Sequence, residues 1–401
     1  MKKKSIMFFG WYFYPKIGGA ETILLNQARE LVARGYNVSV ITSVLDDGVE
    51  NEEDIFGIKV IRRKYIDSRM AQDEKLISCD LSEIIGRVKP DIFHFHNGSY
   101  PSGGKDKSIG VKTILAIFDT ITKFNIPIIE HAHNAQLRDY LATKPLRDLP
   151  WSYLICVSDF VRQEWQKLGT NAAKIKVIHN GIDTELFSKA VANDKMKKIR
   201  SKNDVILFSP ARLFSLTTGK LNKQKNMSLV FDALEELVEK NIHNFVLVSI
   251  FNDVYGSDVV KSAKQLIDRI IKDKKLDEKI VLIPIIDPND MPGFYAGVDI
   301  VCVPAYHETF GMMYLEAMAA GKVVIASNTG GPKEYIRNRE NGFFVDPTDS
   351  KELAALLLEL MQNESLRKKI GKTAALDAKK FSISAMIDEL EKIYKELSSN
   401  A

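Results

Sequence analysis

Short apolar runs recur along this chain and are separated by segments with helical periodicity. They include residues 5–9, 38–43 and 153–157 in the first half, and residues 205–209 and 245–250 in the second. Buried strands that alternate with helices are typical of doubly wound sheets, whose strands run parallel. The sequence therefore predicts an α/β protein, and 401 residues suffice for about two or three such domains.

A Lys-rich segment, residues 184–203, separates the two sets of apolar runs. We expect it to be an interdomain linker, because a fresh strand begins immediately after it. The predicted domains are then an N-terminal domain of residues 1–183 and a C-terminal domain of residues 204–383.

The charge balance is close to neutral, with 56 basic and 52 acidic residues and a net charge of +4. So small an excess argues against a protein dedicated to nucleic acid, although it permits a local basic patch. Cys79, Cys156 and Cys302 are far apart, and each lies in or near an apolar run. They indicate reduced, buried thiols of a cytoplasmic protein rather than a disulfide framework or a metal cluster.

The start of the chain imitates a signal peptide, because three lysines precede the apolar run 6–9. That run is too short, Gly10 interrupts it, and no small-residue cleavage site follows. No stretch approaches the roughly 18 apolar residues of a membrane-spanning helix. We expect a cytoplasmic protein, with peripheral contact at the inner face of the cell membrane left open.

Two carboxylates stand eight positions apart in the stretch 307–321, which reads His-Glu-Thr-Phe-Gly-Met-Met-Tyr-Leu-Glu-Ala-Met-Ala-Ala-Gly. Glu308 lies in a polar segment that ends at Gly311, and Glu316 lies in a run of helix formers that Gly321 ends. A carboxylate in such an apolar helix is costly unless something donates hydrogen bonds to it. A buried salt bridge to a distant Arg or Lys is one solution, and a ligand with hydroxyl donors is another.

A glycine turn, Gly18-Gly19-Ala20-Glu21, follows the first predicted strand and opens a helix. Glycines let the backbone approach a bulky group, and the free N–H groups of a helix start favour an anion. Farther along, His131 and His133 end another predicted strand. Two histidines so spaced could bind a metal, but no third ligand follows at a familiar spacing, so we expect no metal. A histidine bonded to the loop backbone is the other interpretation.

The Glu-x7-Glu pattern, with Phe-Gly after the first Glu and Glu-Ala-Met-Ala-Ala-Gly around the second, resembles the nucleotide-sugar site of a large family. This family is the retaining glycosyltransferases of the GT-B fold, family four, also called glycosyl transferases group 1. The resemblance implies two Rossmann-like doubly wound parallel-sheet domains that face a central cleft. It places the acceptor on residues 1–183 and the nucleotide sugar on residues 204–383, with a last helix, residues 384–401, crossing back onto the first domain.

The resemblance also implies roles for the paired acids and the residues between them. Glu308 would contact hydroxyls of the donor sugar, and Glu316 would accept both ribose hydroxyls. The backbone of Phe310, Gly311 and Met312 would approach the donor phosphates or sugar. These roles agree with elementary chemistry, since a ribose diol is a two-donor ligand that suits one carboxylate, and a helix start favours phosphate.

Further implied contacts lie in both domains. Gly18 and Gly19 would lie beside the donor diphosphate and the acceptor, and His133 would touch the donor sugar. Arg212 and Lys225 would clamp the diphosphate. The loop between these two cations, residues 214–224, is longer than the family usually has, which leaves two nearby lysines as alternatives to Lys225, namely Lys220 and Lys223.

The implied activity is transfer of a sugar from a nucleotide diphosphate sugar to a glycan, lipid-linked or protein-linked acceptor, with retention. A UDP-sugar such as UDP-GlcNAc or UDP-glucose is our best expectation, and polysaccharide biosynthesis is the expected setting. The catalytic set would be His133, Glu308, Arg212 and Lys225, with no cofactor. No metal is expected, because cations and helix termini can stabilise the leaving group and the sequence has no Asp-x-Asp. A non-catalytic partner of the same fold, or an epimerase or phosphorylase, remains an alternative.

Overall fold

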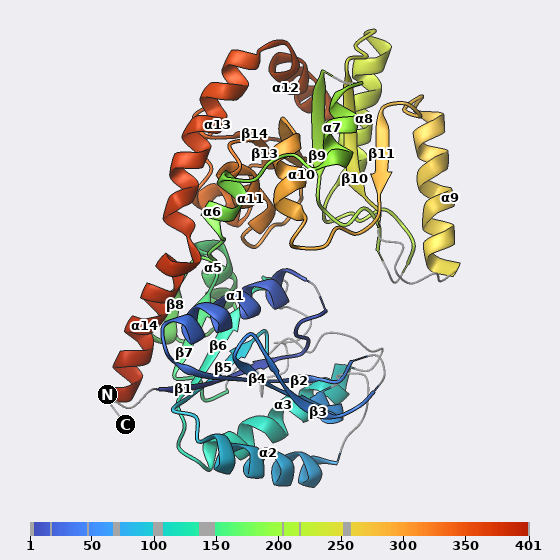
Figure 1. Cartoon of the computed structure of the whole chain (residues 1–401). Helices are drawn as coiled ribbons and strands as arrows, with labels where there is room; N and C mark the ends of the chain where they lie inside the picture. Colours follow the sequence, from blue (N-terminus) through green and yellow to red (C-terminus); the bar gives the residue numbers. More distant parts are fainter. Residues whose placement is uncertain are drawn as a thin grey trace. The chain divides into compact units, whose positions relative to one another are not determined.

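The computed structural model (Figure 1) describes residues 4–16, 18–45, 48–66, 73–98, 107–135, 149–202, 204–215, 218–251 and 258–399. The chain divides into two compact units. One comprises Met1–Gly181 with Ile383–Ala401, and the other comprises Ile182–Ser382. Each unit has its own mainly parallel sheet, so the predicted class of two doubly wound α/β domains is confirmed.

The first unit is built on a sheet with, among the described residues, eight strands in the order β3-β4-β2-β1-β5-β6-β7-β8. Its strands are β1 (Ser5–Gly10), β2 (Asn37–Ser43), β3 (Asn51–Ile55), β4 (Ile58–Arg63), β5 (Ile92–His96), β6 (Ile128–Ala132), β7 (Tyr153–Cys156) and β8 (Ile175–Val177). Neighbours run parallel, except that β3 pairs antiparallel with β4. The central strands β5 and β6 are buried along their whole length, as expected of a sheet covered on both faces.

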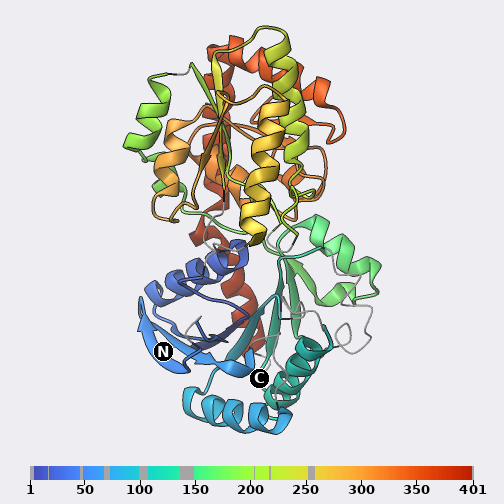
Figure 2. The same cartoon turned by 90° about the vertical axis from the view of Figure 1, so that its right-hand side faces the viewer.

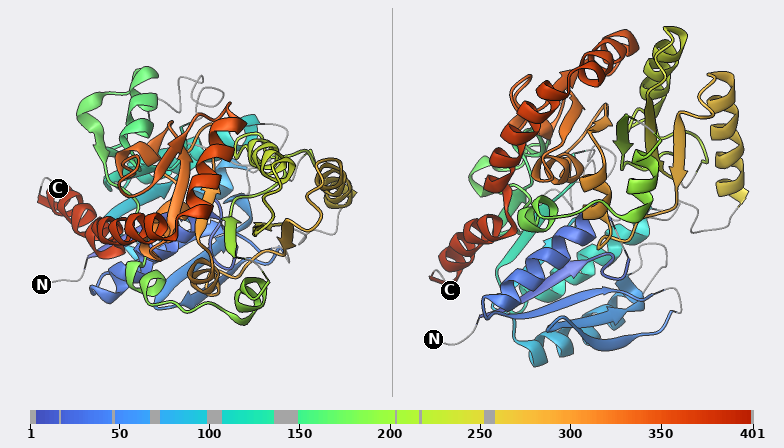
Figure 3. Two further views of the ribbon diagram at one scale, coloured as in Figure 1. Left: turned by 90° about the horizontal axis from the view of Figure 1, so that it is seen from above. Right: turned by 45° about the horizontal axis from the view of Figure 1, so that its top comes forward.

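Helices cover both faces of this sheet. They are α1 (Gly19–Ala33), α2 (Glu74–Val88), α3 (Lys107–Thr122), α5 (Asp159–Lys167) and α14 (Ile383–Ser399), with 3-10 turns at Lys64–Ile66 and Ala172–Lys174. In Figure 1, α1 lies on one face of the sheet, while α2 and α3 lie on the other. The last helix, α14, runs alongside α1 in both views of Figure 3.

The second unit has a wholly parallel sheet of six strands within the described residues, in the order β11-β10-β9-β12-β13-β14. Its strands are β9 (Val205–Ser209), β10 (Phe245–Ile250), β11 (Ile280–Ile283), β12 (Ile300–Val303), β13 (Val323–Ser327) and β14 (Phe343–Val345). The strand order reverses between β9 and β12. Ligands of such sheets bind at this reversal, beyond the carboxyl ends of the strands.

The helices of the second unit also form two layers. They are α6 (Thr184–Ser188), α7 (Asp194–Arg200), α8 (Met227–Glu239), α9 (Asp258–Asp273), α10 (Met291–Gly297), α11 (Met312–Ala319), α12 (Ser350–Gln362) and α13 (Glu364–Ala378), with 3-10 turns at Gly331–Glu334 and Lys379–Phe381. Apolar residues of α8, α9 and α12 join those of the strands in one continuous core. Figure 2 shows α9, in yellow, over the strands of this sheet.

Three features differ from the expectations. The segment 184–203, expected to be a linker, carries α6 and α7 and belongs to the second unit. The acidic stretch before residue 58, not predicted as a strand, contains β3. Cys156 and Cys302 are buried as predicted, but the prediction for Cys79 was wrong, because its side chain is exposed on α2. Among the described helices, none is both long and apolar enough to cross a membrane.

Candidate functional site

The segment with the paired acids forms a strand, a loop and a helix in the second unit. β12 leads into the loop of Glu308, and α11 begins after Gly311. Gly311 adopts a φ of 86°, and a Cβ there would lie 2.5 Å from the Tyr314 ring and 3.1 Å from Cγ of Glu308. Only glycine fits this turn without displacing its neighbours. The first N–H groups of α11 therefore begin directly beside the Glu308 loop.

Lys225 is the lysine that the structure brings to Glu308. Its Nζ donates to Oε2 of Glu308 at 2.6 Å, and both side chains are largely covered. The two alternatives, Lys220 and Lys223, are exposed and have no ion pair within the described part of the chain. The local pairing therefore favours Lys225 as the cation of this site.

Two polar residues beside Lys225 fix its segment to the loop that carries Glu308. Gln224 accepts a hydrogen bond from the Tyr306 backbone N–H at 2.9 Å, and its amide donates to the His307 carbonyl at 3.1 Å. The Asn226 amide donates to the Pro304 carbonyl at 3.1 Å. Cation and carboxylate are thus held by backbone contacts as well as by their own attraction.

A second glycine turn supports the Glu308 loop from behind. The Gly331 N–H donates to the Glu308 carbonyl at 2.9 Å. A Cβ on Gly330 would lie 2.2 Å from that carbonyl oxygen, and a Cβ on Gly331 would lie 2.1 Å from the Thr309 oxygen. Both distances are far below van der Waals contact. This close backbone approach is what the Gly-Gly pair provides.

Glu316 is paired with a tyrosine instead of a base. Its Oε2 accepts from the Tyr295 hydroxyl at 2.8 Å. Burial raises the pKa of Glu316 to about 7, although the Tyr295 hydrogen bond lowers it. No Lys or Arg pairs with Glu316 among the residues described, which argues against the buried salt bridge considered above. The carboxylate has one oxygen with no hydrogen bond to a described residue, and its side chain is half-buried.

The other predicted donor contacts of this unit fall into two groups. The Phe310 side chain is buried against Tyr335 and Phe381, so any contact of Phe310 with a ligand would come from its backbone. Met312 is half-buried at the start of α11. Arg212 follows β9, is exposed, and forms no ion pair within the described ranges.

In the first unit, Gly18 and Gly19 start α1 as predicted. Gly18 is the extended N-cap, and a Cβ there would lie 2.1 Å from the Glu21 carboxylate. Gly19 has open space where a Cβ would project. A hollow of about 190 Å³ opens beside this helix start, lined by Trp11, Tyr12, Glu21, His96, Asn97 and Asn134 among others.

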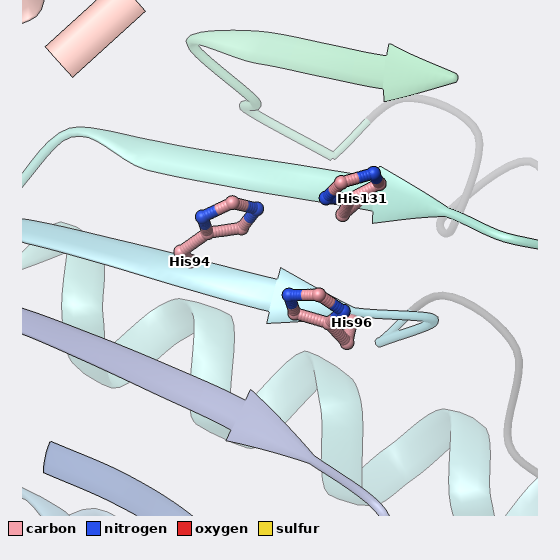
Figure 4. Close-up of side chains that lie close together, drawn as sticks. All are labelled: His94, His96 and His131. Atoms are coloured by element: carbon pink, nitrogen blue, oxygen red, sulfur yellow. The ribbon is translucent and has the colours of Figure 1, made fainter. Parts of the chain in front are cut away.

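Four buried histidines lie on or directly after β5 and β6, and one of them, His96, lines this hollow. Figure 4 shows His94, His96 and His131 along the two strands, and His133 follows His131. Their rings stack, with centroids 5.5 Å apart for His94 and His131 and 4.7 Å for His131 and His133. Burial lowers the pKa of every one of them, to about 3 for His94 and His133. The array is therefore uncharged at neutral pH.

This array can be tested as a metal centre. Ring nitrogens of His94, His96 and His131 lie within 4.8 Å of one another. The His94 and His131 planes are only 10° apart, with ring centroids 5.5 Å apart. Both His96 nitrogens already have partners, His133 and Gln27. The geometry fits a hydrogen-bonded stack of neutral rings better than a metal centre.

His133, the predicted sugar contact, is almost fully buried and belongs to this stack. Its Nε2 lies 2.9 Å from Nδ1 of His96, and its backbone N–H donates to the Asn97 side chain at 2.8 Å. Its Nδ1 has no hydrogen-bond partner among the described residues. The neighbour His131 is fully buried and lies 3.4 Å from the Gln27 amide.

Two family models match this chain. Glycosyltransferase Family 4 matches residues 17–186, and Glycosyl transferases group 1 matches residues 199–377. The chain belongs to this glycosyltransferase family. Its sequence is 25% identical over 395 residues to the uncharacterized glycosyltransferase MJ1607 of Methanocaldococcus jannaschii, covering 96% of each chain. It is 24% identical to the D-inositol 3-phosphate glycosyltransferase of Corynebacterium aurimucosum, covering 95% of this chain and 92% of the relative.

Solved structures support the same fold. A glycosyltransferase from Rickettsia africae superposes with a TM-score of 0.77 at 21% identity over 100% of both chains. Anabaena Alr3699/HepE, solved in complex with UDP-glucose, superposes with a TM-score of 0.76 at 18% identity, covering 98% of this chain and 99% of that one. The fold of this glycosyltransferase is therefore GT-B.

Some contacts of the site did not follow from the sequence. The Gly330-Gly331 turn carried a signal, its glycine pair, but its contact with the Glu308 loop did not follow from it. Tyr295 and Gln27 carried none, because their partners lie 21 and 104 residues away.

Proposed function

We propose that this glycosyltransferase moves a sugar from a nucleotide diphosphate sugar to a glycan, lipid-linked or protein-linked acceptor. A UDP-sugar such as UDP-glucose or UDP-GlcNAc is the donor we favour, since Anabaena Alr3699/HepE was solved with UDP-glucose. The observation that carries the proposal is the Lys225–Glu308 ion pair at the loop that leads into α11, with Glu316 about one turn into that helix.

The sugar, the ribose and the diphosphate of the donor substrate each have a chemically matched partner in the second unit. Glu308 accepts sugar hydroxyls with the oxygen that Lys225 does not occupy. Glu316 accepts the ribose hydroxyls, because one of its oxygens has only the Tyr295 hydroxyl and the other has no described partner. The diphosphate lies against Lys225, Arg212 and the N–H groups of α11.

Bond cleavage places negative charge on the diphosphate and positive charge on the anomeric carbon. Lys225, Arg212 and the positive end of α11 stabilise that leaving group, so the proposed reaction needs neither metal nor cofactor. Retention is part of the proposal. A leaving-group oxygen takes the acceptor proton while the new bond forms on the face from which the old one departs.

The acceptor belongs to the hollow of the first unit. Trp11 and Tyr12 offer aromatic surface, while Glu21, Asn97 and Asn134 offer hydrogen bonds. This combination suits a hydroxyl-rich group such as a sugar ring. A cytoplasmic enzyme of polysaccharide biosynthesis, without a nucleic-acid partner, fits these proposals.

Purified full-length protein is to be assayed for UDP release from UDP-glucose and UDP-GlcNAc, with and without glycan acceptors. We expect transfer or slow hydrolysis, an unchanged rate in chelator, and a loss of at least about 100-fold in Glu308→Ala. Lys225→Met should weaken UDP binding by roughly tenfold or more, and Lys223→Met, the matched control, should not. Absence of UDP binding would reject the proposal, and epimer formation without acceptor would replace it with the epimerase alternative.

A further inference from the structure

A buried glutamine of α1 stands between two of the stacked histidines. Oε1 of Gln27 lies 3.1 Å from Nε2 of His96, and its Nε2 lies 3.4 Å from Nδ1 of His131. The same Nε2 lies 3.5 Å from the sulfur of Met386. Gln27 is fully buried, so each contact of its amide replaces water.

The sulfur decides which way the amide points. A thioether can accept a hydrogen bond but has no proton to donate. The NH₂ group of Gln27 therefore faces Met386 and His131, and the carbonyl oxygen faces His96. A carbonyl oxygen only accepts, so Nε2 of His96 must carry the proton of that ring.

The protonation of His96 determines which nitrogen of His133 carries a proton. A neutral imidazole carries one N–H, so Nδ1 of His96 is bare and accepts. Its partner at 2.9 Å, Nε2 of His133, must then donate. Nδ1 of His133 is consequently bare. The low pKa values of His96 and His133, which burial causes, keep both rings neutral at physiological pH.

We propose that Gln27 and His96 are positioning residues that fix His133 in its Nε2–H tautomer, so that Nδ1 accepts a hydrogen bond from a sugar hydroxyl. Nδ1 is buried without a partner among the described residues. Nε2 of His94 and Nε2 of His131 share this state, and a ligand hydroxyl is the partner that we propose for Nδ1 of His133. A bare nitrogen selects a hydroxyl and rejects phosphate and carboxylate oxygens, which also only accept. The hydroxyl contact rests on the proposed function, whereas the tautomer does not.

The tautomer can be read directly by NMR. Full-length protein labelled with ¹⁵N-histidine has seven ring systems to assign, by single His→Gln substitutions where needed. We expect His133 to show a protonated Nε2 and an unprotonated Nδ1. A protonated Nδ1 in the wild-type protein would overturn the proposal outright.

Substitutions test the role of the glutamine. Gln27→Leu removes the acceptor that faces His96, so we expect the Nδ1–H form of His133 to become populated. Gln27→Glu keeps an acceptor there and should retain the wild-type tautomer, while Asn26→Leu, the neighbouring amide on α1, is the control. If the His133 tautomer is unchanged in folded Gln27→Leu, Gln27 does not fix it and the proposal is contradicted. If Gln27→Leu does not fold, loss of the wild-type tautomer in Gln27→Glu contradicts it instead.

Turnover of UDP-glucose separates this inference from the proposed function. Gln27→Leu should lower kcat by about tenfold or more, because an Nδ1–H reverses this hydrogen bond and the sugar hydroxyl must turn to accept it, and Gln27→Glu should restore most of the rate. If the His133 tautomer shifts without any change in kcat, the hydroxyl contact is rejected, but the control of this tautomer by Gln27 and His96 is not. Wild-type protein without activity on any donor would reject the function alone.

Discussion

The two acids of the motif meet different partners, and this difference sets their chemistry. Glu308 pairs with the ammonium group of Lys225 at 2.6 Å, so its charge is matched in the free enzyme. Glu316 is half-buried and accepts from a tyrosine hydroxyl, and burial raises its pKa to about 7. A carboxylate whose charge is this poorly compensated is typical of a site that awaits donors from a ligand.

UDP affinity should therefore depend on pH. The ionised carboxylate of Glu316 accepts two ribose hydroxyls better than the protonated form does, so we expect binding to tighten between pH 6 and pH 8. Tyr295→Phe removes a contact that lowers this pKa, and should move the transition to higher pH. Calorimetric titration of UDP over this range provides the measurement, with Tyr14→Phe as the control. Constant affinity across the range would contradict the ribose role of Glu316.

The contribution of Glu316 to folding stability should fall over the pH range in which UDP affinity rises. Because the folded pKa of Glu316, about 7, lies above the ordinary 4.5, the folded chain keeps a proton that the unfolded chain has lost between these values. The stabilisation from this group is complete below pH 4.5 and is lost as the pH rises through 7. Glu316→Gln should thus raise the free energy of unfolding at pH 8 by on the order of 2 kcal/mol, and with it the Tm. At pH 4.5 both should change little. A lower Tm at pH 8 would show that the charge stabilises the fold.

At the scale of elements, the predictable features were those whose signal lies within one local segment. The Glu308 loop and the helix of Glu316 follow from a polar stretch, helix formers and two glycines. β3 could not be predicted in this way, because it is a polar edge strand. Its Glu52 and Glu53 pair with Arg63 and Arg62 of the neighbouring strand, and these pairs exist only once the strands meet.

The same reasoning explains what was missed in the site. Gln27 and Tyr295 look like ordinary helix residues, and their roles depend on residues brought near by the fold. The segment 184–203 was misassigned because its lysines suggested a solvated linker. In the structure its helix α7 has Met196 buried and Arg200 paired with Asp299 at 2.7 Å.

The Gly330-Gly331 turn supports the Glu308 loop, and a substitution in it tests that support. Gly331→Ala would place a Cβ 2.1 Å from the Thr309 carbonyl oxygen, so the Glu308 loop must shift. We expect UDP-glucose turnover to fall by at least about tenfold, because small misplacements of catalytic groups are costly. Gly86→Ala, in open space within α2, is the control and should stabilise the helix slightly. Full activity in Gly331→Ala would show that the turn does not position Glu308.

At the scale of the whole molecule, the two units differ in how the chain builds them. The second unit is one continuous segment, whereas the first needs α14 from the end of the chain. Arg34, the residue that follows α1, pairs with Asp388 at 2.6 Å, and the Tyr394 hydroxyl lies 2.7 Å from Nδ1 of the buried His94. Met386, Ile387 and Leu390 are buried, so α14 completes the core of the first unit.

This asymmetry predicts how fragments behave. Residues 182–382 contain a sheet, a continuous core and the four side chains of this unit that we propose to bind the donor, Arg212, Lys225, Glu308 and Glu316. We expect this fragment to unfold cooperatively and to bind UDP within about tenfold of the full chain's affinity. Residues 1–181 alone should lack a cooperative transition, because the apolar surface that α14 covers would face water. Both fragments are to be studied by calorimetry and UDP titration. A stable 1–181 fragment would contradict the structural role of α14. A folded 182–382 fragment that does not bind UDP would contradict the placement of donor binding in the second unit.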